Sequence, residues 1–277
     1  MDRLTPFVKW AGGKTQLLEK LHEKMPEIYN RYYEPFIGGG ALFLSLKPKN
    51  AVINDVNSQL LNVYRQLKND AENVIRILKS YDDCECDRMH YEEMRTMYNN
   101  MIENNQLTSE CAAMTIWINK HCFNGLYRVN KKGLFNVPFN NKNSGKSMDE
   151  ENLRKIGEFL NESNAEILEG DFEKACETVE IGDFVYFDSP YVPVNETANF
   201  TDYTKDGFTY EDHKRLSELF KSLDKKGVKI MLSNHDVQLV HDLYAGYNIE
   251  NISVRRHINS DASKRTGKEV IITNYRK

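Results

Sequence analysis

Four consecutive residues, Asp188-Ser189-Pro190-Tyr191, have the chemistry to hold a planar base that carries an exocyclic amine. They end the apolar run Phe184–Asp188, which predicts a buried strand, and open α/β sheets bind ligands at the carboxyl ends of their strands. The Asp188 carboxylate and the Ser189 carbonyl can accept hydrogen bonds from the amine, which frees its lone pair in an electrostatic form of catalysis. Tyr191 can stack on the base, and Pro190 stiffens the corner. Taken alone, the tetrapeptide fits an ordinary strand followed by a Ser-Pro turn equally well.

A glycine-rich segment, Glu34–Gly40 (EPFIGGG), follows an expected strand and precedes an expected helix. Glycines from Gly38 to Gly40 let the backbone turn sharply and approach a ligand. Asp55 stands 17 residues after Gly38, where an acid can accept hydrogen bonds from ribose hydroxyls. Because Phe43 occupies the third glycine position of G-x-G-x-x-G, a nucleoside ligand without a pyrophosphate fits better than NAD.

A second segment, Gly13-Lys14-Thr15, matches the end of the phosphate-binding motif G-x-x-x-x-G-K-[ST]. The first glycine of that motif would fall at position 8, which is Val8, and no strand precedes the segment. An NTPase site is therefore disfavoured.

The stretch Cys111–Met148 contains no Asp or Glu. Aromatic and Asn residues lie between its six basic residues, which are Lys120, Arg128, Lys131, Lys132, Lys142 and Lys146. Charge of one sign combined with amides and aromatics suits phosphates and base edges, so we favour a DNA-facing insertion over a solvated loop. The run NGLYRVNKKGLFNVPF predicts a β-hairpin with Lys132-Gly133 near its turn.

These segments must be positioned by a mostly parallel α/β sheet that is covered on both faces. Short apolar, β-branched runs predict six strands, at 31–36, 51–55, 166–171, 184–188, 228–233 and 269–274. Helical patterns at 15–24, 41–46 and 211–223 lie between or beside them, and residues 57–114 are polar with helical periodicity.

The composition is that of a globular chain of 277 residues with a formal net charge of −4, which excludes a globally basic nucleic-acid coat protein. We expect no membrane helix and no secretory signal, because no apolar run is long enough and MDRLTPFVKW lacks an apolar core.

Five irregularly spaced cysteines indicate reduced thiols and a cytoplasmic location. Cys84 and Cys86 are interpreted as solvent-side residues rather than as metal ligands, and no metal is expected. No cysteine follows a proline, so the nucleophile of cytosine-C5 methyltransferases is absent.

Seven motifs in order make the chain resemble the DNA adenine-N6 methyltransferases of the Dam family, the α group of amino-methyltransferases, and in particular their DpnM-like members. The motifs are KWAGGK, EPFIGGG, VIND, FNGLYRVN with FNVPF, EGDFEKA, YFDSPY and IMLSN. The resemblance covers essentially the whole chain. It implies that a methyl group passes directly, by in-line displacement, from S-adenosylmethionine to N6 of an adenine flipped out of double-stranded DNA, within GATC.

The resemblance also implies a discontinuous architecture. A Rossmann-like domain that binds S-adenosylmethionine would comprise residues 1–56 and 160–277. Residues 57–159 would form a target-recognition domain, a helical bundle plus a DNA-reading hairpin at about 120–140. The protein is expected to act as a monomer on double-stranded DNA.

Functional residues are carried over from the family by position. Those implied to hold S-adenosylmethionine are Trp10, Lys14, Phe36, Gly38 to Gly40, Asp55 for the ribose, Asp171 and Phe172 for the adenine ring, and Asp188. The catalytic tetrad would be Asp188, Ser189, Pro190 and Tyr191. The DNA-binding residues would be Lys9, Asn124, Leu126, Arg128 and Pro138, with Lys131 and Lys132 on phosphates.

Two departures from the family pattern bear on these assignments. Ser189 replaces the first Pro of the usual Asp-Pro-Pro-Tyr, although its backbone carbonyl is retained. Asn140-Asn141-Lys142 replaces a Gly, a basic residue and an aromatic after FNVPF. The alternatives left open are cytosine-N4 methylation, which Asp188 disfavours, amino-methylation of RNA, and a catalytically weak DNA-binding relative. The sequence does not separate an orphan enzyme from a restriction-system or phage enzyme.

Overall fold

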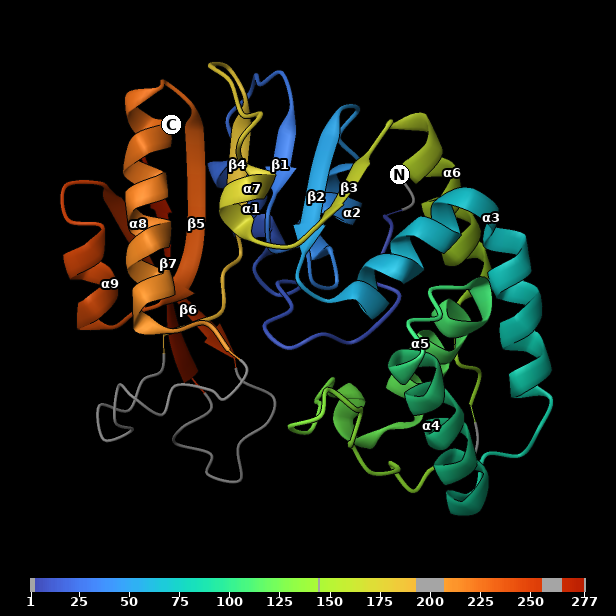
Figure 1. Cartoon of the computed structure of the whole chain (residues 1–277). Helices are drawn as coiled ribbons and strands as arrows, with labels where there is room; N and C mark the ends of the chain where they lie inside the picture. The colour runs from blue at the N-terminus through green and yellow to red at the C-terminus, as the bar shows by residue number, and fades with distance from the viewer. Residues whose placement is uncertain (1–2, 144, 193–206, 256–265, 277) are drawn as a thin grey trace. The chain divides into compact units, whose positions relative to one another are not determined.

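The computed structural model describes residues 3–143, 145–192, 207–255 and 266–276, which form an α/β protein (Figure 1). Its sheet has seven strands in these ranges, in the order β3-β2-β1-β4-β5-β7-β6. The strands are β1 (Tyr32–Glu34), β2 (Ala51–Asp55), β3 (Glu166–Glu169), β4 (Phe184–Phe187), β5 (Lys229–His235), β6 (Asn248–Arg255) and β7 (Thr266–Thr273). β1 lies parallel to β2 and β4, and β4 lies parallel to β5, whereas β7 runs antiparallel to both β5 and β6.

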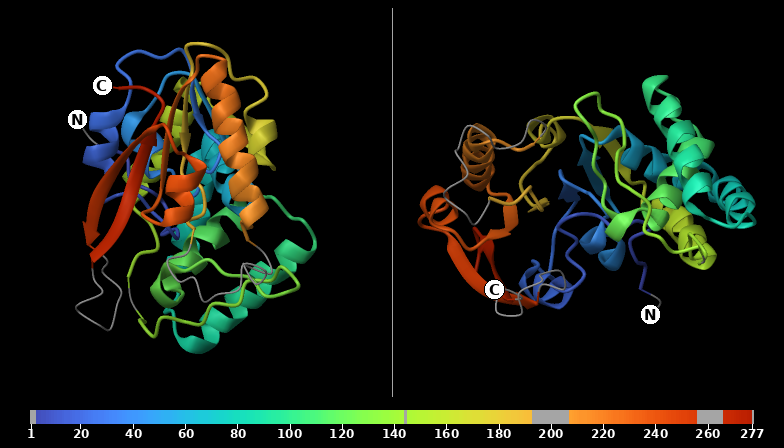
Figure 2. Two further views of the ribbon diagram at one scale, coloured as in Figure 1. Left: turned by 90° about the vertical axis from the view of Figure 1, so that its left-hand side faces the viewer. Right: turned by 90° about the horizontal axis from the view of Figure 1, so that it is seen from below.

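The predicted fold class is confirmed, and each of the six predicted strands forms within a few residues of its predicted bounds. The prediction missed β6, which is the strand at the edge of the sheet beside β7 (Figure 2). Its residues NIENISVR place Asn, Glu and Ser between single Ile and Val residues, and the described polar side chains are exposed. An edge strand with so few apolar residues carries little periodic signal.

The chain divides into two compact units, and each is described by itself. The first unit comprises Met1–Gly13, Ile37–Lys49 and Asn54–Gly170, and the second comprises Lys14–Phe36, Asn50–Ile53 and Asp171–Lys277. The division into residues 1–56 with 160–277 and residues 57–159 stays a prediction.

The first unit is mainly helical and contains α2 (Ala41–Leu46), α3 (Ser58–Asp82), α4 (Arg88–Glu103), α5 (Ser109–His121) and α6 (Glu150–Glu162) (Figure 1). α3 to α6 each begin after a side chain that accepts a backbone N–H of the first turn, from Asn57, Asp87, Thr108 and Asp149. Gly157 lets α6 approach α3 closely, because a Cβ there would lie 2.6 Å from the Leu67 carbonyl oxygen. The helical prediction for residues 57–114 is confirmed.

The predicted hairpin, residues 122–139, is present as a loop with two isolated antiparallel bridges, Cys122 to Phe139 and Val129 to Phe135. A short 3₁₀ helix, η1 (Phe123–Gly125), opens it. Its turn is closed by hydrogen bonds of Asn130, and Gly133 has a φ of 78° there. The two bridges are not joined into a continuous ladder, and the Asn99 side chain of α4 bonds to both backbone groups of Phe135.

The second unit contains most of the sheet together with α1 (Leu18–Lys24), α7 (Phe172–Ala175), α8 (Tyr210–Lys225) and α9 (Gln238–Leu243). All four residues of β4 are buried, which explains their continuous apolar run. α8 packs along β5 (Figure 1). Among the described helices, none is both long enough and apolar enough to cross a bilayer.

Candidate active site

The end of β4 places Asp188 beside the end of β5. The two strands are parallel, with Phe187 opposite Leu232, so the residues that follow these two lie at the same edge of the sheet. The Ser233 hydroxyl donates to Asp188 Oδ1 over 3.2 Å and lies 2.9 Å from the Tyr186 hydroxyl. Sheet register therefore places the carboxylate beside Ser233.

Lys14 forms a buried ion pair with the same carboxylate. Its Nζ lies 2.5 Å from Asp188 Oδ1, and the Lys14 side chain is only 3% exposed. Burial raises the pKa of Asp188, and the ion pair with Lys14 acts in the opposite direction. Both Lys14 and Ser233 use Oδ1, and within the described residues Oδ2 makes no hydrogen bond. That second oxygen is the acceptor that an incoming N–H group would meet.

Two further residues of the tetrad, Ser189 and Tyr191, are held by β5 and β7. Asn234 accepts the Val192 N–H over 3.0 Å and donates to the buried Ser189 hydroxyl over 3.3 Å. The Tyr191 hydroxyl donates to Glu269 Oε2 over 2.6 Å, and Lys14 Nζ lies 4.5 Å from the centre of its ring. Burial raises the pKa of Tyr191, so its phenol stays neutral. Pro190 is exposed.

Two of the predicted cofactor residues meet in an aromatic cluster of the second unit. Phe36, Phe172 and Phe208 have ring centroids 5.3 to 5.6 Å apart. Phe36 and Phe208 are partly exposed, whereas Phe172 is buried. A partly exposed aromatic cluster is a suitable surface for a purine ring.

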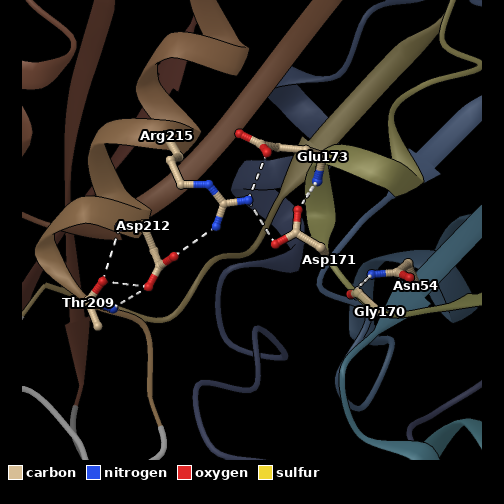
Figure 3. Close-up of polar contacts among 7 residues, drawn as sticks. All are labelled: Asn54, Gly170, Asp171, Glu173, Thr209, Asp212 and Arg215. Carbon is tan, nitrogen blue, oxygen red and sulfur yellow. Dashed lines mark hydrogen bonds and ion pairs between the residues drawn. The ribbon is translucent and has the colours of Figure 1, made fainter.

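Asp171 lies in a network of charges centred on Arg215 of α8 (Figure 3). Asp171 Oδ1 accepts the Glu173 N–H at the start of α7, and Oδ2 pairs with Arg215 over 2.9 Å. The same guanidinium pairs with Glu173 over 2.7 Å and with Asp212 over 2.9 Å, and it lies 4.9 Å from the Phe172 ring centre. Sequence reasoning missed Arg215, since nothing local links it to a residue 44 positions earlier.

In the first unit, Asp55 organises the glycine-rich turn. Its two oxygens accept the N–H groups of Gly38 and Asn57, each over 3.0 Å. Burial raises the pKa of Asp55, and these backbone hydrogen bonds lower it. Gly40 has a φ of 66°, and a Cβ there would lie 2.4 Å from the Tyr64 hydroxyl, so this position requires glycine.

Trp10 connects the glycine-rich turn to the hairpin within the same unit. A Cβ on Gly38 would lie 2.8 Å from Trp10 Cδ1, so the indole packs directly on the turn. The indole also stacks on Tyr127, with centroids 5.0 Å apart and an interplanar angle of 29°. The structure therefore brings Trp10, Gly38 and Asp55 together, and their binding of a cofactor stays a prediction.

The residues predicted to bind DNA are all exposed, namely Lys9, Asn124, Leu126, Arg128, Lys131, Lys132 and Pro138. Arg128 Nε donates to the Asn136 side chain over 2.8 Å and Nη2 donates to the Asn136 carbonyl, which holds one edge of the guanidinium. A planar guanidinium held in this way is suited to the two acceptors of a guanine.

The cysteines are free thiols, and the prediction for the Cys84–Cys86 pair is half wrong: Cys84 is exposed, but Cys86 is buried. Burial raises the pKa of the Cys86 thiol to about 11, and the nearby Asp87 and Asp82 carboxylates act in the same direction. Within the described ranges, no group of three or more His, Cys, Asp or Glu side chains is arranged to hold a metal ion.

Comparison with known proteins places the chain in a family. The model of the D12 class N6 adenine-specific DNA methyltransferases matches residues 10–258. The chain is 46% identical over 274 residues to a type II methyltransferase, M1.LlaDCHI, of Lactococcus lactis subsp. cremoris, covering 98% of this chain and 96% of the relative. It is 31% identical over 264 residues to the DNA adenine methylase of Haemophilus influenzae, covering 94% of this chain and 90% of the relative.

Among solved structures, a class I S-adenosylmethionine-dependent methyltransferase of Listeria monocytogenes aligns with a TM-score of 0.39 and 12% identity, over 94% of this chain and 57% of that one. The family match and the two relatives confirm the resemblance found in the sequence motifs. The chain belongs to the D12 class of N6 adenine-specific DNA methyltransferases.

Proposed function

We propose that this enzyme methylates N6 of adenine within GATC in double-stranded DNA, with S-adenosylmethionine as the methyl donor and the target base flipped out of the helix. The observation that carries the proposal is the corner after β4. There a partly buried carboxylate is held by Lys14 and Ser233 through one oxygen, while the other oxygen makes no hydrogen bond within the described residues. Asp188 Oδ2 and the Ser189 carbonyl then provide the two acceptors for the two N–H groups of N6.

The chemistry of the corner follows from those two acceptors. The N6 lone pair is delocalised into the ring, and hydrogen bonds from both N–H groups draw the nitrogen towards tetrahedral geometry. When bound, S-adenosylmethionine supplies a methyl group made electrophilic by a positively charged sulfur. The N6 to carbon bond forms as the carbon to sulfur bond breaks, and N6 then loses one proton to Asp188 or solvent. Lys14 keeps the buried Asp188 in its acceptor form until that transfer.

The binding residues of the donor are proposed from both the sequence motifs and their surroundings. Asp55 ends β2 and accepts the Gly38 N–H of the glycine-rich turn, where it can take the ribose hydroxyls, and Phe36 with Phe172 provides an aromatic surface for the adenine. The chemistry of these side chains fits an adenosine group. The remaining proposed contacts come from Trp10, Lys14, Gly38, Gly40, Asp171 and Asp188.

GATC reading is proposed for the exposed residues of the first unit. Arg128 and Lys9 would contact guanines, Asn124, Leu126 and Pro138 would contact the remaining bases, and Lys131 with Lys132 would contact phosphates. The Haemophilus influenzae relative is named a DNA adenine methylase, which supports this substrate class. A monomeric state and a cytoplasmic location stay predictions.

Product analysis tests the proposal. The purified protein is incubated with methyl-labelled S-adenosylmethionine and a DNA duplex that contains every possible four-base sequence. The DNA is then digested to nucleosides. We expect N6-methyl-2′-deoxyadenosine, and mapping should place it in GATC. Label in N4-methyl-2′-deoxycytidine would contradict the chemistry, and N6-methyl-2′-deoxyadenosine at another site would contradict the recognition sequence alone.

A further inference from the structure

Asn119 is a buried polar residue near the end of α5 whose amide is fully engaged. It is only 4% exposed. Its Oδ1 accepts the Lys9 N–H over 2.8 Å, and its Nδ2 donates to the Lys9 carbonyl over 2.9 Å and to the Gly125 carbonyl over 3.0 Å. Since both amide hydrogens and the amide oxygen have partners, this side chain has one defined orientation.

The partners of Asn119 belong to two segments that are far apart in the sequence. Lys9 lies 110 residues before Asn119, and Gly125 lies 6 residues after it. Both segments carry residues proposed to read DNA: Lys9 itself, and Asn124 with Leu126 on either side of Gly125. One buried amide therefore joins the backbones of two exposed segments within the first unit.

Gly125 shows how closely the two segments approach. It has a φ of 65°, and a Cβ there would lie 2.7 Å from Lys9 Cβ and 2.6 Å from Lys9 Cδ. Because Lys9 Cβ is fixed by the backbone, a side chain at position 125 would have to push the two segments apart. Position 125 thus requires glycine both for its conformation and for contact with Lys9.

The backbone around Asn119 ties the end of α5 to the same turn. The Cys122 thiol donates to the Asn119 carbonyl over 3.3 Å and lies 3.2 Å from the Leu126 carbonyl oxygen. The Asn140 N–H donates to the His121 carbonyl over 2.9 Å. The end of this helix is therefore the base on which the hairpin is built, and Asn119 is its link to Lys9.

We propose that Asn119 is a positioning residue for sequence recognition: it fixes the spacing between Lys9 and the Asn124–Leu126 turn, so that both read DNA as one rigid surface. The proposal rests on the proposed function of these residues in DNA reading. Asn119 is itself buried and touches no base. It acts because bidentate readout tolerates only small displacements of the reading side chains.

Asn62 provides a matched control in the same unit. It is also a buried amide, 1% exposed, and it donates to the Thr108 carbonyl over 2.9 Å. It accepts from Gln66 over 3.3 Å. Neither Thr108 nor Gln66 is among the residues proposed to bind DNA. A purely structural role for Asn119 would make its variants behave like those of Asn62.

The test compares Asn119→Asp and Asn119→Ala with Asn62→Ala and wild type. Duplexes carrying the wild-type site, as mapped by product analysis, and each single-base variant of that site are methylated, and kcat/KM is measured for each. Asparagine to aspartate keeps the shape but removes both donors and places negative charge against two carbonyls. We expect Asn119→Asp to lower the preference for the wild-type site about tenfold, with KM for S-adenosylmethionine unchanged. Asn62→Ala should lower the unfolding temperature and leave the preference unchanged.

A folded Asn119→Asp enzyme with wild-type preference overturns the proposal, as does an equal loss of preference in Asn62→Ala. If the Asn119 variants fail to fold, Gly125→Ala tests the same contact from the other side, because its Cβ meets Lys9. Loss of preference in Gly125→Ala supports the proposal, and unchanged preference overturns it. A wild-type enzyme that shows no site preference would instead refute the proposed function.

Discussion

The proposed catalytic corner of the second unit, residues 188–191, and the hairpin of the first unit are held by different kinds of interaction. The corner follows two paired, buried strands, and backbone register places Asp188 beside Ser233. The hairpin has only isolated bridges, and side-chain amides of Asn99 and Asn119 bond to its backbone instead. Strand pairing is cooperative and tolerates the loss of one side chain, whereas an amide that bridges two segments has no substitute. Catalysis should therefore be robust to changes around the corner, and specificity should be sensitive to changes behind the hairpin.

The largest effect is expected when the Asp188 carboxylate is removed. Asp188→Ala should reduce methyl transfer by about a hundredfold or more, because a preorganised electrostatic contact is lost. Since Lys14 would then be a buried unpaired charge, this variant should also unfold at a lower temperature. Single-turnover transfer from labelled S-adenosylmethionine measures the rate.

The double variant Lys14→Met with Asp188→Asn is the control for that loss of stability. It removes both charges, so it should recover the unfolding temperature but not the activity. Substantial turnover by folded Asp188→Ala would show that the acceptor pair is not the source of catalysis.

A smaller and more selective effect is expected in the hairpin. Arg128→Ala should lower the preference for guanine over the other bases at one position of the site by about tenfold. A bidentate guanine contact contributes roughly 1–3 kcal/mol of discrimination. The double variant Lys131→Ala with Lys132→Ala should weaken binding to every sequence alike and flatten its salt dependence. Methylation rates on GATC duplexes and on single-base variants, at two salt concentrations, separate the two behaviours. An equal slowing of all duplexes by Arg128→Ala would identify Arg128 as a phosphate contact.

Variants of Arg215 test whether the charge network around Asp171 supports binding of S-adenosylmethionine. Arg215→Gln removes the cation that holds Asp171, Glu173 and Asp212 together (Figure 3). We expect KM for S-adenosylmethionine to rise about fivefold or less with kcat unchanged, because partly exposed ion pairs contribute about 1 kcal/mol or less.

Lys214→Gln is the matched control for Arg215→Gln, since the contacts described for Lys214, an ion pair with Glu211 and a cation–π contact with Tyr210, lie within α8 itself. It should leave KM for S-adenosylmethionine unchanged. An unchanged KM in Arg215→Gln would show that these ion pairs stabilise α8 and do not support binding of S-adenosylmethionine.

The comparison also explains which features the sequence could predict. Strands such as β4 and motif residues such as Asp188 and Asp55 are local signals. The structure places Asp55 at the end of β2 and Asp188 directly after β4. The pairing of Lys14 with Asp188 and the bonds from Asn119 to Lys9 join residues far apart in the chain, and single-sequence periodicity carries no information about them. Sequence reasoning consequently named the residues expected to do chemistry, Lys14 among them, but did not find the contacts that position them, and it missed Asn119 and Arg215.

The smallest effect is expected for the departure from the family tetrad. In Ser189→Pro the backbone carbonyl proposed to accept from N6 is retained, and within the described residues the Ser189 N–H donates no hydrogen bond. The change removes the long hydrogen bond from Asn234, which still holds the Val192 N–H. We expect kcat/KM within about threefold of wild type and a loss of stability of about 1 kcal/mol, measured by methyl transfer and thermal unfolding.

Ser189→Ala separates the hydroxyl from the backbone in this experiment. If both variants keep their activity, the corner is held redundantly, as its strand register implies. An inactive Ser189→Pro beside an active Ser189→Ala would show that the proline ring distorts the backbone between Asp188 and Pro190. Loss of activity in both would make the Ser189 hydroxyl as indispensable to the corner as Asn119 is proposed to be for the hairpin, and the contrast between the two regions would fail.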